Sequence, residues 1–239
     1  MTWSIVAHDT VSGAFAVAVA TRSLAVGASC PFVRSGVGAV STQSLTNRYL
    51  GPAVLDLMQQ GVAPAEAIER ALIPDEGRHL RQLHAVDIEG RTAAWTGRHC
   101  VTWCGDRTGS HISVAGNMLA GPEVVGATFD TFQACAGLEL PERLMAAMDA
   151  GESAGGDRRG RQSAAMLLTT TEVFPDLDLR VDDHGDPLSE LRRLLGVWRD
   201  SWPARKVWSP SKSNPSGMTD LDTIERQWKA QGLDLRLRR

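Results

Sequence analysis

The segment AFAVAVAT at residues 14–21 decides the fold class of this chain. Its even positions are all alanine, and its odd positions include Phe15, Val17 and Val19, so the strand is apolar on both faces. Antiparallel strands commonly leave one face in water, whereas a strand that is apolar on both faces is covered on both sides. The segment therefore predicts two sheets stacked face to face with helices outside each. This arrangement is a four-layer αββα sandwich of the α+β class.

Apolar periodicity and turn residues divide the rest of the first 200 residues into strands and helices. The turn DTVSG joins strands at 3–8 and 14–21 into a first hairpin. Further strands are expected at 36–42, 82–88, 91–96, 163–170 and 177–182, with one or two more within 100–117. Helices are expected at 49–60, 64–72, 121–137, 140–151 and 186–199.

Composition excludes several classes of protein. The chain has 239 residues, 43% of them hydrophobic and 22% charged, which is ordinary for a globular protein. A net charge of -3 gives no basic field, so nucleic acid is not an expected partner. Because no run approaches eighteen apolar residues and no secretory signal precedes the first strand, we expect no membrane association and a cytoplasmic location.

The composition changes after residue 200. The segment SWPARKVWSPSKSNPSG is rich in Pro and Ser and predicts an extended arm, followed by a short helix at 219–231. We therefore expect a main domain at 1–200 and a C-terminal arm at 201–239. The arm carries eight Lys or Arg and four Asp or Glu, a charge of +4, which leaves -7 on the domain. A basic arm can fold onto its own acidic domain or onto a neighbouring subunit, and a homodimer is one option for the assembly.

Thr2 stands at the tip of the first strand, where removal of Met1 would leave it as the N-terminal residue. Methionine aminopeptidases remove Met1 before small residues, and threonine qualifies. An N-terminal threonine has a hydroxyl nucleophile and an α-amino base in one residue. The ordinary pKa of an α-amino group is about 7.7–8.0, so part of the amine is unprotonated near neutral pH. The alternative is that Thr2 is only a strand residue.

A resemblance adds weight to the nucleophile interpretation. The segments TWSIVAHD, GAFAVAVATRSLAVG, GVGAVSTQSLTNRYLGP, AGNMLAGPEVV, AGESAGGDRRGRQSAA and DLRVDDHGDPLSELRRL resemble the bacterial family called domain of unknown function 1028. This family is placed among the Ntn (N-terminal nucleophile) hydrolases, and the resemblance covers roughly residues 1–200. It implies the αββα fold and a Thr2 nucleophile, and it supplies no substrate.

The side-chain chemistry of residues expected near Thr2 indicates candidates for catalysis and substrate binding. The first hairpin places Thr2 opposite residues 20–22, so Arg22 and Ser23 are expected close to it. An arginine there would favour the neutral amine and could bind a substrate carboxylate. Asn117, between a glycine and an apolar residue, is a candidate oxyanion donor, or an asparagine that bonds a turn. Gln43 and Asn47 are weaker candidates for polar contacts with substrate.

The segment GGDRRGRQS at 155–163 is the other polar cluster. Its glycines allow close approach of the backbone, and Arg158 and Arg161 are candidates for binding a carboxylate or phosphate. Asp157 would orient one of the three arginines of this segment or the Thr2 ammonium. The absence of a lysine excludes a Walker loop, and a solvated loop without function is the alternative.

Metal chemistry is the main competing interpretation. His99, Cys100, Cys104 and His111 lie close in sequence, and on a strand residues 100 and 104 would share one face. Their spacing is not that of a standard zinc pair, and the four cysteines of the chain are expected as reduced thiols. The acidic trio DDH at 182–184 precedes a helix cap and is more typical of a structural role. No metal or other cofactor is expected.

Three functions remain open at the level of sequence. The first is an Ntn-type hydrolase that cleaves an amide bond of a small, carboxylate-bearing molecule through an acyl-Thr2 intermediate. The second is a catalytically silent ligand-binding or assembly protein on the same fold. The third is a metal-dependent hydrolase.

Overall fold

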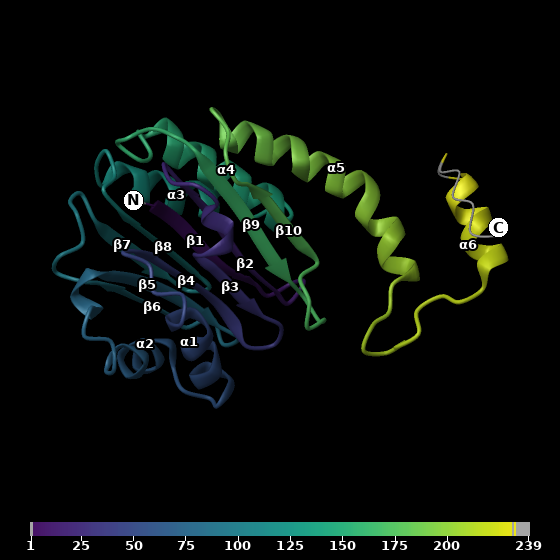
Figure 1. Ribbon diagram of the computed structural model, residues 1–239, viewed down its shortest axis with the longest axis horizontal. Coiled ribbons are helices and arrows are strands. Elements are labelled where there is room, and N and C mark those ends of the chain that lie inside the picture. The colour runs from purple at the N-terminus through teal and green to yellow at the C-terminus, as the bar shows by residue number, and fades with distance from the viewer. Residues whose placement is uncertain (1, 231, 233–239) are drawn as a thin grey trace. The chain divides into compact units, whose positions relative to one another are not determined.

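The computed structural model describes residues 2–230 and residue 232 (Figure 1). The chain divides into two compact units, one ending at Leu195 and the other beginning at Gly196. Within the described residues, no helix combines the length and the apolar character needed to cross a membrane.

Two antiparallel sheets form the centre of the first unit. The larger sheet has the order β10-β9-β2-β1-β8-β7, and the smaller has the order β3-β4-β5-β6. The strands are β1 (Thr2–Asp9), β2 (Ala14–Thr21), β3 (Pro31–Arg34), β4 (Gly38–Ser44), β5 (Arg81–Asp87), β6 (Thr92–Thr96), β7 (Gly105–Gly109), β8 (Ile112–Asn117), β9 (Ser163–Thr169) and β10 (Leu177–Val181).

Helices pack against both sheets. Helices α1 and α2 contact strands of the smaller sheet, and helices α3 and α4 contact strands of the larger one (Figure 1). The helices are α1 (Leu50–Gln59), α2 (Pro64–Leu72), α3 (Glu123–Ala134), α4 (Leu140–Ser153), α5 (Pro187–Trp208) and α6 (Leu221–Ala230), with short 3-10 turns η1 (Val26–Ala28) and η2 (Arg78–Leu80). The structure is thus a mixed α+β fold with antiparallel sheets, as the first two strands predicted.

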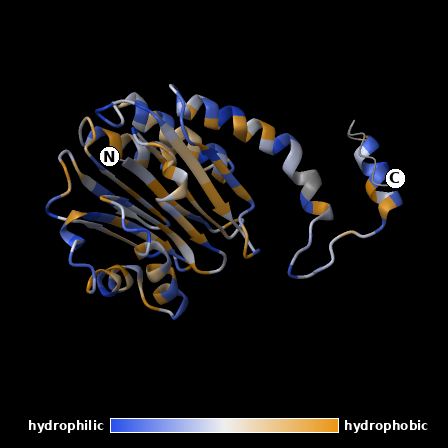
Figure 2. Ribbon diagram, viewed as in Figure 1, coloured by the Kyte–Doolittle hydropathy of each residue, from blue (hydrophilic) through white to orange (hydrophobic). Residues whose placement is uncertain are grey.

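The two sheets face one another through β1, which contacts β4 and β5 of the smaller sheet. Apolar side chains between the sheets include Val6, Phe15, Val17 and Val86, all buried. On the other face of β2 the four alanines leave room for α4. Figure 2 shows hydrophobic colouring along the strands, whereas the helices alternate hydrophilic and hydrophobic residues. Each face of AFAVAVAT is therefore covered, for the reason that its composition indicated.

The structure differs from the predicted local structure at β3, at the end of α4 and at the end of α5. No strand was predicted at β3, which has only four residues and starts with a proline, Pro31. The strand lies at the edge of its sheet, where a missing backbone N–H is tolerated. Helix α4 continues past Gly151 to Ser153. A Cβ at Gly151 would lie 2.2 Å from Thr128 Oγ1, so this glycine allows close packing instead of ending the helix.

Helix α5 also differs from expectation, because it runs to Trp208 instead of ending near 199. The first part of the expected extended arm is therefore helical. Within the second unit, the rings of Trp208 and Trp228 meet edge to face at 5.1 Å between centroids. Helix α6 lies within the helix expected at 219–231, whose final residue falls outside the described part of the chain.

Candidate active site

Thr2 begins β1, a strand in the interior of the larger sheet. Its pairing partner on β8 is Asn117. On the other side, Trp3 pairs with Ala20, which places Thr2 beside Thr21. The Thr2 and Thr21 Oγ1 atoms lie 3.3 Å apart, and only 5% of Thr2 is exposed. The register therefore agrees with the expected hairpin and holds the Thr2 hydroxyl between two neighbouring strands.

Strand alternation sets the direction of the Thr2 side chain. Thr2, Ser4 and Val6 share one face of β1, because side chains alternate along a strand. Ser4 Oγ lies 2.7 Å from Gln43 Oε1 and 2.7 Å from His84 Nε2, and both of these residues belong to the smaller sheet. The face shared by Thr2 and Ser4 is therefore the one between the two sheets.

Two amide side chains face the carbonyl of Thr2, and a third amide, that of Gln82, bonds both of them. Gln82 Oε1 accepts hydrogen bonds from Gln43 Nε2 at 2.8 Å and from Asn117 Nδ2 at 2.9 Å. The same two amide nitrogens lie 3.5 Å from the Thr2 carbonyl oxygen. Gln82 Nε2 donates to the carbonyl of Gly116 at 2.8 Å. These bonds fix the orientation of both amides that face Thr2.

A hydroxyl–imidazole chain continues this buried layer away from Thr2. His84 Nδ1 lies 3.1 Å from Ser113 Oγ, and Ser4 Oγ also contacts Ser41 Oγ at 3.0 Å. Burial lowers the pKa of His84 to about 3, so the ring is neutral near pH 7. A neutral imidazole has one donor and one acceptor nitrogen, which matches its two hydroxyl partners.

Gln82 and His84 were missed by the sequence analysis. Both lie on β5, where polar residues alternate with apolar ones in the pattern of a strand with one solvated face. The structure instead places this polar face against the larger sheet. The signal that could have identified it is the presence of polar residues on the same face of β1, β4 and β8, namely Ser4, Ser41, Gln43, Ser113 and Asn117.

Asp157 ties the loop after α4 to the end of β2. Its carboxylate accepts hydrogen bonds from the backbone N–H groups of Arg22 at 2.8 Å and Arg159 at 2.9 Å. The Arg159 guanidinium lies 3.1 Å from the same carboxylate, whose side chain is 1% exposed. Asp157 also forms an isolated bridge with Leu119, just beyond Asn117. The arginine that Asp157 orients is Arg159.

The other arginine and serine residues predicted for the site lie near this loop, and they are exposed or form hydrogen bonds or ion pairs with residues other than Thr2. The Arg22 guanidinium donates to Gln162 at 3.2 Å. Ser23 is exposed, and its carbonyl accepts from Ser163 Oγ at 2.6 Å. Arg158 is also exposed. Arg161 forms ion pairs with Glu152 and Asp186, which compensate its charge.

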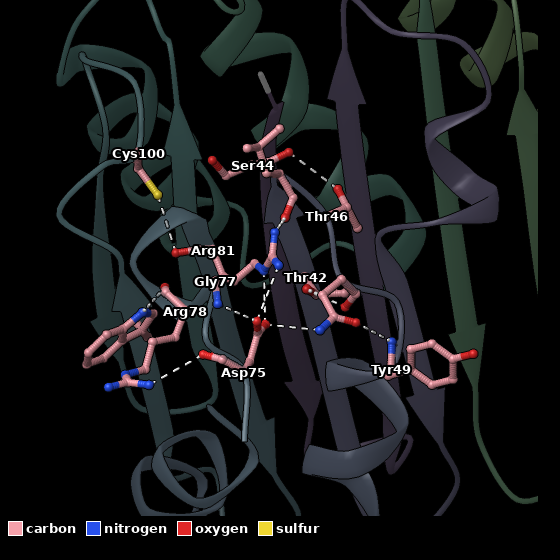
Figure 3. A network of polar contacts seen from close by, with 12 residues as sticks. Thr42, Ser44, Thr46, Tyr49, Asp75, Gly77, Arg78, Arg81 and Cys100 are labelled. Carbon is pink, nitrogen blue, oxygen red and sulfur yellow. Dashed lines mark hydrogen bonds and ion pairs between the residues drawn. The ribbon is translucent and has the colours of Figure 1, made fainter. Parts of the chain in front are cut away.

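Asn47 belongs to a separate network around Asp75. Figure 3 labels Asp75 and Arg81 in this network. Asn47 Nδ2 donates to Asp75 Oδ2 at 3.0 Å, and Arg81 Nε donates to the same oxygen at 2.9 Å. The hydrogen bond from Arg81 is the main reason that the pKa of Asp75 falls to about 2. Arg81 also donates to the carbonyl of Leu45 at 2.6 Å. Asn47 thus anchors the loop that follows β4.

The residues of the competing metal interpretation do not gather into one cluster, although Cys104 Sγ contacts the carbonyl of Cys100. Residues 100–104 lie outside the strands, because β7 begins only at Gly105, so Cys100 and Cys104 do not share a strand face. Cys100 Sγ donates to the carbonyl of Arg81, and His99 stacks edge to face on His79. His111 contacts His8 instead. Within the described part of the chain, no group of three or more His, Cys, Asp or Glu could hold a metal ion.

The DDH trio at 182–184 makes structural contacts. Asp182 pairs with Arg180, and Asp183 accepts from Gln162 at 3.2 Å. His184 Nδ1 accepts from the backbone N–H of Asp186 at 3.0 Å, just before α5.

Comparison with known proteins gives a family and a related structure. The model of a "Family of unknown function (DUF1028)" matches residues 2–191. The crystal structure of protein SPO2555 from Silicibacter pomeroyi, assigned to the same family, is 33% identical with a TM-score of 0.85. The alignment covers 92% of this chain and 96% of that chain. No protein with a curated function matches the sequence.

More distant structures belong to Anbu, the ancestral beta-subunit. Anbu from Yersinia bercovieri is 12% identical with a TM-score of 0.39, over 85% of this chain and 97% of that chain. Anbu from Hyphomicrobium sp. strain MC1, in a Gly-1 mutant, is 12% identical with a TM-score of 0.40, over 88% and 99%. Scores below 0.5 do not define the fold of this chain.

Proposed function

This chain belongs to the DUF1028 family of unknown function, and from that premise we propose that it is an Ntn-type hydrolase with Thr2 as its nucleophile. The substrate class is a small molecule with an amide bond and a carboxylate. The observation that carries the proposal is the position of Thr2. It begins an interior strand, faces the space between two sheets and has its hydroxyl 3.3 Å from that of Thr21.

The layers of the first unit support the finer fold assignment. Helices α1 and α2 contact one sheet, helices α3 and α4 contact the other, and β1 contacts strands of both sheets. We assign this arrangement to the four-layer αββα sandwich of the Ntn hydrolases. In that architecture the nucleophile stands at the end of a central strand, which is the position of Thr2 here.

The proposed reaction needs no cofactor. After Met1 is removed, the neutral α-amine of Thr2 takes the proton of its own hydroxyl, directly or through one water, while Oγ1 attacks the amide carbonyl. The resulting ammonium then gives this proton to the leaving nitrogen, and the C–N bond breaks. Water attacks the acyl-Thr2 ester and loses a proton to the amine, the acyl C–Oγ1 bond breaks, and the ammonium returns that proton to Oγ1. The products are an amine, a carboxylic acid and the regenerated threonine.

Neutral amides are the groups that would meet the developing charge. Asn117 Nδ2 makes a 2.9 Å bond to Gln82 but only a 3.5 Å contact with the Thr2 carbonyl. A hydrogen bond at 3.5 Å contributes little, so the Asn117 Nδ2 proton that points to the Thr2 carbonyl is available for another acceptor. We assign this proton to the oxyanion of the tetrahedral intermediate. Gln82 would hold the amide in place during the reaction. Such fixed donors stabilise a tetrahedral intermediate because they need no reorganisation.

Arg22 is the group that we assign to the substrate carboxylate. It follows Thr21 directly, and its backbone is fixed by the buried Asp157. Its side chain is exposed and has only a neutral amide, Gln162, as its hydrogen-bond partner in the described structure. A guanidinium that is not consumed by an ion pair can form a bidentate contact with a carboxylate.

One observation favours a silent binding protein as the second candidate. Thr2 is 5% exposed and sits in a layer of satisfied hydrogen bonds, which would also suit a purely structural residue. Removal of Met1 separates the two functions, because only the hydrolase requires it.

The test compares three proteins with a panel of small amides, including N-acyl amino acids. Thr2→Ala and Thr2→Ser both keep a small second residue, so Met1 removal is retained, and only the serine variant keeps the hydroxyl. We expect Thr2→Ala to lower the hydrolysis rate about a thousandfold or more, as loss of a nucleophile does elsewhere. We expect Thr2→Ser to retain turnover. Equal turnover by wild type and Thr2→Ala would refute the proposal.

A further inference from the structure

A cleft on the smaller sheet lies around Trp95, the one indole of edge strand β6. It comprises a cavity of about 370 Å³ lined by Glu76, Arg78, His79, Trp95, Thr96 and Arg98. A second cavity of about 250 Å³ shares Arg78 and Trp95 with it. The larger cavity alone reaches the lower end of the volumes typical of small-molecule sites, about 300–1,000 Å³.

The walls of this cleft are fixed by backbone contacts. Trp95 Nε1 donates to the carbonyl of Arg78 at 3.2 Å, which holds the indole ring against turn η2. The backbone N–H of His99 donates to the carbonyl of His79 at 2.9 Å. A Cβ on Gly97 would lie 2.4 Å from the same His79 carbonyl, so only glycine allows this approach. A ligand would therefore meet a preformed site and would not have to order it.

The larger cavity combines an open aromatic face with two arginines and one carboxylate. Trp95 is 38% exposed although its nitrogen is satisfied. Across the residues that the structure describes, neither Arg78 nor Arg98 forms an ion pair. One carboxylate, Glu76, lines the larger cavity beside the two arginines, which leaves an excess of positive charge there.

The smaller cavity has a different character. It adds the apolar side chains of Leu72 and Ile73, and Ile73 is 70% exposed. It is lined by one carboxylate, Glu69, and one arginine, Arg78. The two cavities, which share Trp95 and Arg78, therefore offer an apolar end and a cationic end.

We propose that this cleft is a binding site for a small aromatic carboxylate. The ring of the ligand stacks on Trp95, its carboxylate faces Arg78 and Arg98, and its apolar edge lies toward Leu72 and Ile73. Arginine guanidinium groups match the planar geometry of a carboxylate, and an indole face suits a second aromatic ring. The site is defined by residues that the Thr2 chemistry does not use, so it stands independently of the proposed hydrolase.

The test is a ligand-observed NMR titration of the full chain with indole-3-acetate, and with indole-3-ethanol as the neutral analogue. A ligand of this size at about -0.3 kcal/mol per heavy atom would bind with a dissociation constant of about 1 mM. We expect saturable binding of the acid in this range and binding of the alcohol weakened by about tenfold, the scale of one charged hydrogen bond.

Two variants locate the site. Trp95→Leu removes the stacking face, and Arg98→Gln removes one charge while leaving the indole in place, so the second variant remains informative if the first folds poorly. Arg70→Gln, at an exposed arginine of α2 outside the cleft, is the matched control. We expect each cleft variant to weaken binding about tenfold, as for loss of one charged contact, and the control to bind like wild type. Absence of saturable binding, equal binding of acid and alcohol, or binding unchanged in both cleft variants would overturn the proposal.

Discussion

Replacing His84 with glutamine should make the protein's stability less sensitive to acid. His84 is buried between the sheets, and its pKa is lowered from 6.5 to about 3 by burial. Between these values the unfolded chain binds a proton at this histidine, and the folded chain does not. The folded state is therefore progressively destabilised as the pH falls below 6.5. At pH 5 the deficit is about 1.5 pH units multiplied by 1.36 kcal/mol, or about 2 kcal/mol.

The glutamine variant keeps a neutral polar group for Ser4 and Ser113 and removes the titration. Urea unfolding of wild type and His84→Gln at pH 7 and pH 5 gives four free energies of unfolding. Groups other than His84 cancel when the acid-induced losses of the two proteins are subtracted. We expect wild type to lose about 2 kcal/mol more than the variant.

The control for this experiment is His99→Gln, at an exposed ring. This variant should show the same acid-induced loss as wild type. Equal losses for wild type and His84→Gln would mean that His84 takes up a proton in the folded state. The buried hydroxyl–imidazole chain described above would then be incorrect.

Three further predictions concern other parts of the chain. Asp75→Asn should lower the free energy of unfolding at pH 7 by about 2 kcal/mol, because it removes the carboxylate whose pKa Arg81 holds at about 2. In thermal or urea unfolding, the difference from wild type should shrink as the pH falls from 3.8 toward 2. A difference that stays constant with pH would contradict this prediction. If the Arg22 guanidinium binds the substrate carboxylate by two hydrogen bonds, Arg22→Ala and Arg22→Lys should both lower kcat/KM for a carboxylate substrate. The loss of transition-state stabilisation in Arg22→Ala should be on the order of 2–5 kcal/mol. Near-normal kinetics of Arg22→Ala would remove Arg22 from the site. A chain cut after Asp200 should keep its circular dichroism and cooperative melting, since both sheets precede that residue, and collapse on truncation would show that the second unit completes the fold.

The sequence was sufficient to predict the fold wherever a local pattern corresponds to a local structure. The two-sided apolar pattern of residues 14–21 and the turn at 9–13 predicted the first hairpin, and the observed register confirms the pairing around Thr2. Local patterns were insufficient at Pro31–Arg34, a four-residue edge strand, and at the end of α5, where Pro and Ser suggested an extended chain.

The residues of the candidate site were harder to predict from the sequence than the fold, because the geometry of the site depends on contacts between the two sheets. Asn117 was nominated from its odd position at a strand end, and it is paired directly with Thr2. Gln82 was not nominated, because an amide on an alternating strand is typical of a solvated face. Only the stacking of the sheets shows that it bonds both Gln43 and Asn117.

Mass spectrometry of the intact protein tests the central claim most directly. The protein is incubated with the amide panel, quenched in acid and weighed, and its N-terminal peptide is then sequenced. We predict a chain that begins at Thr2 and an added acyl mass on that residue, absent from Thr2→Ala. Active protein that fully retains Met1, or an acyl group located on any other residue, would contradict the role of Thr2 as the N-terminal nucleophile.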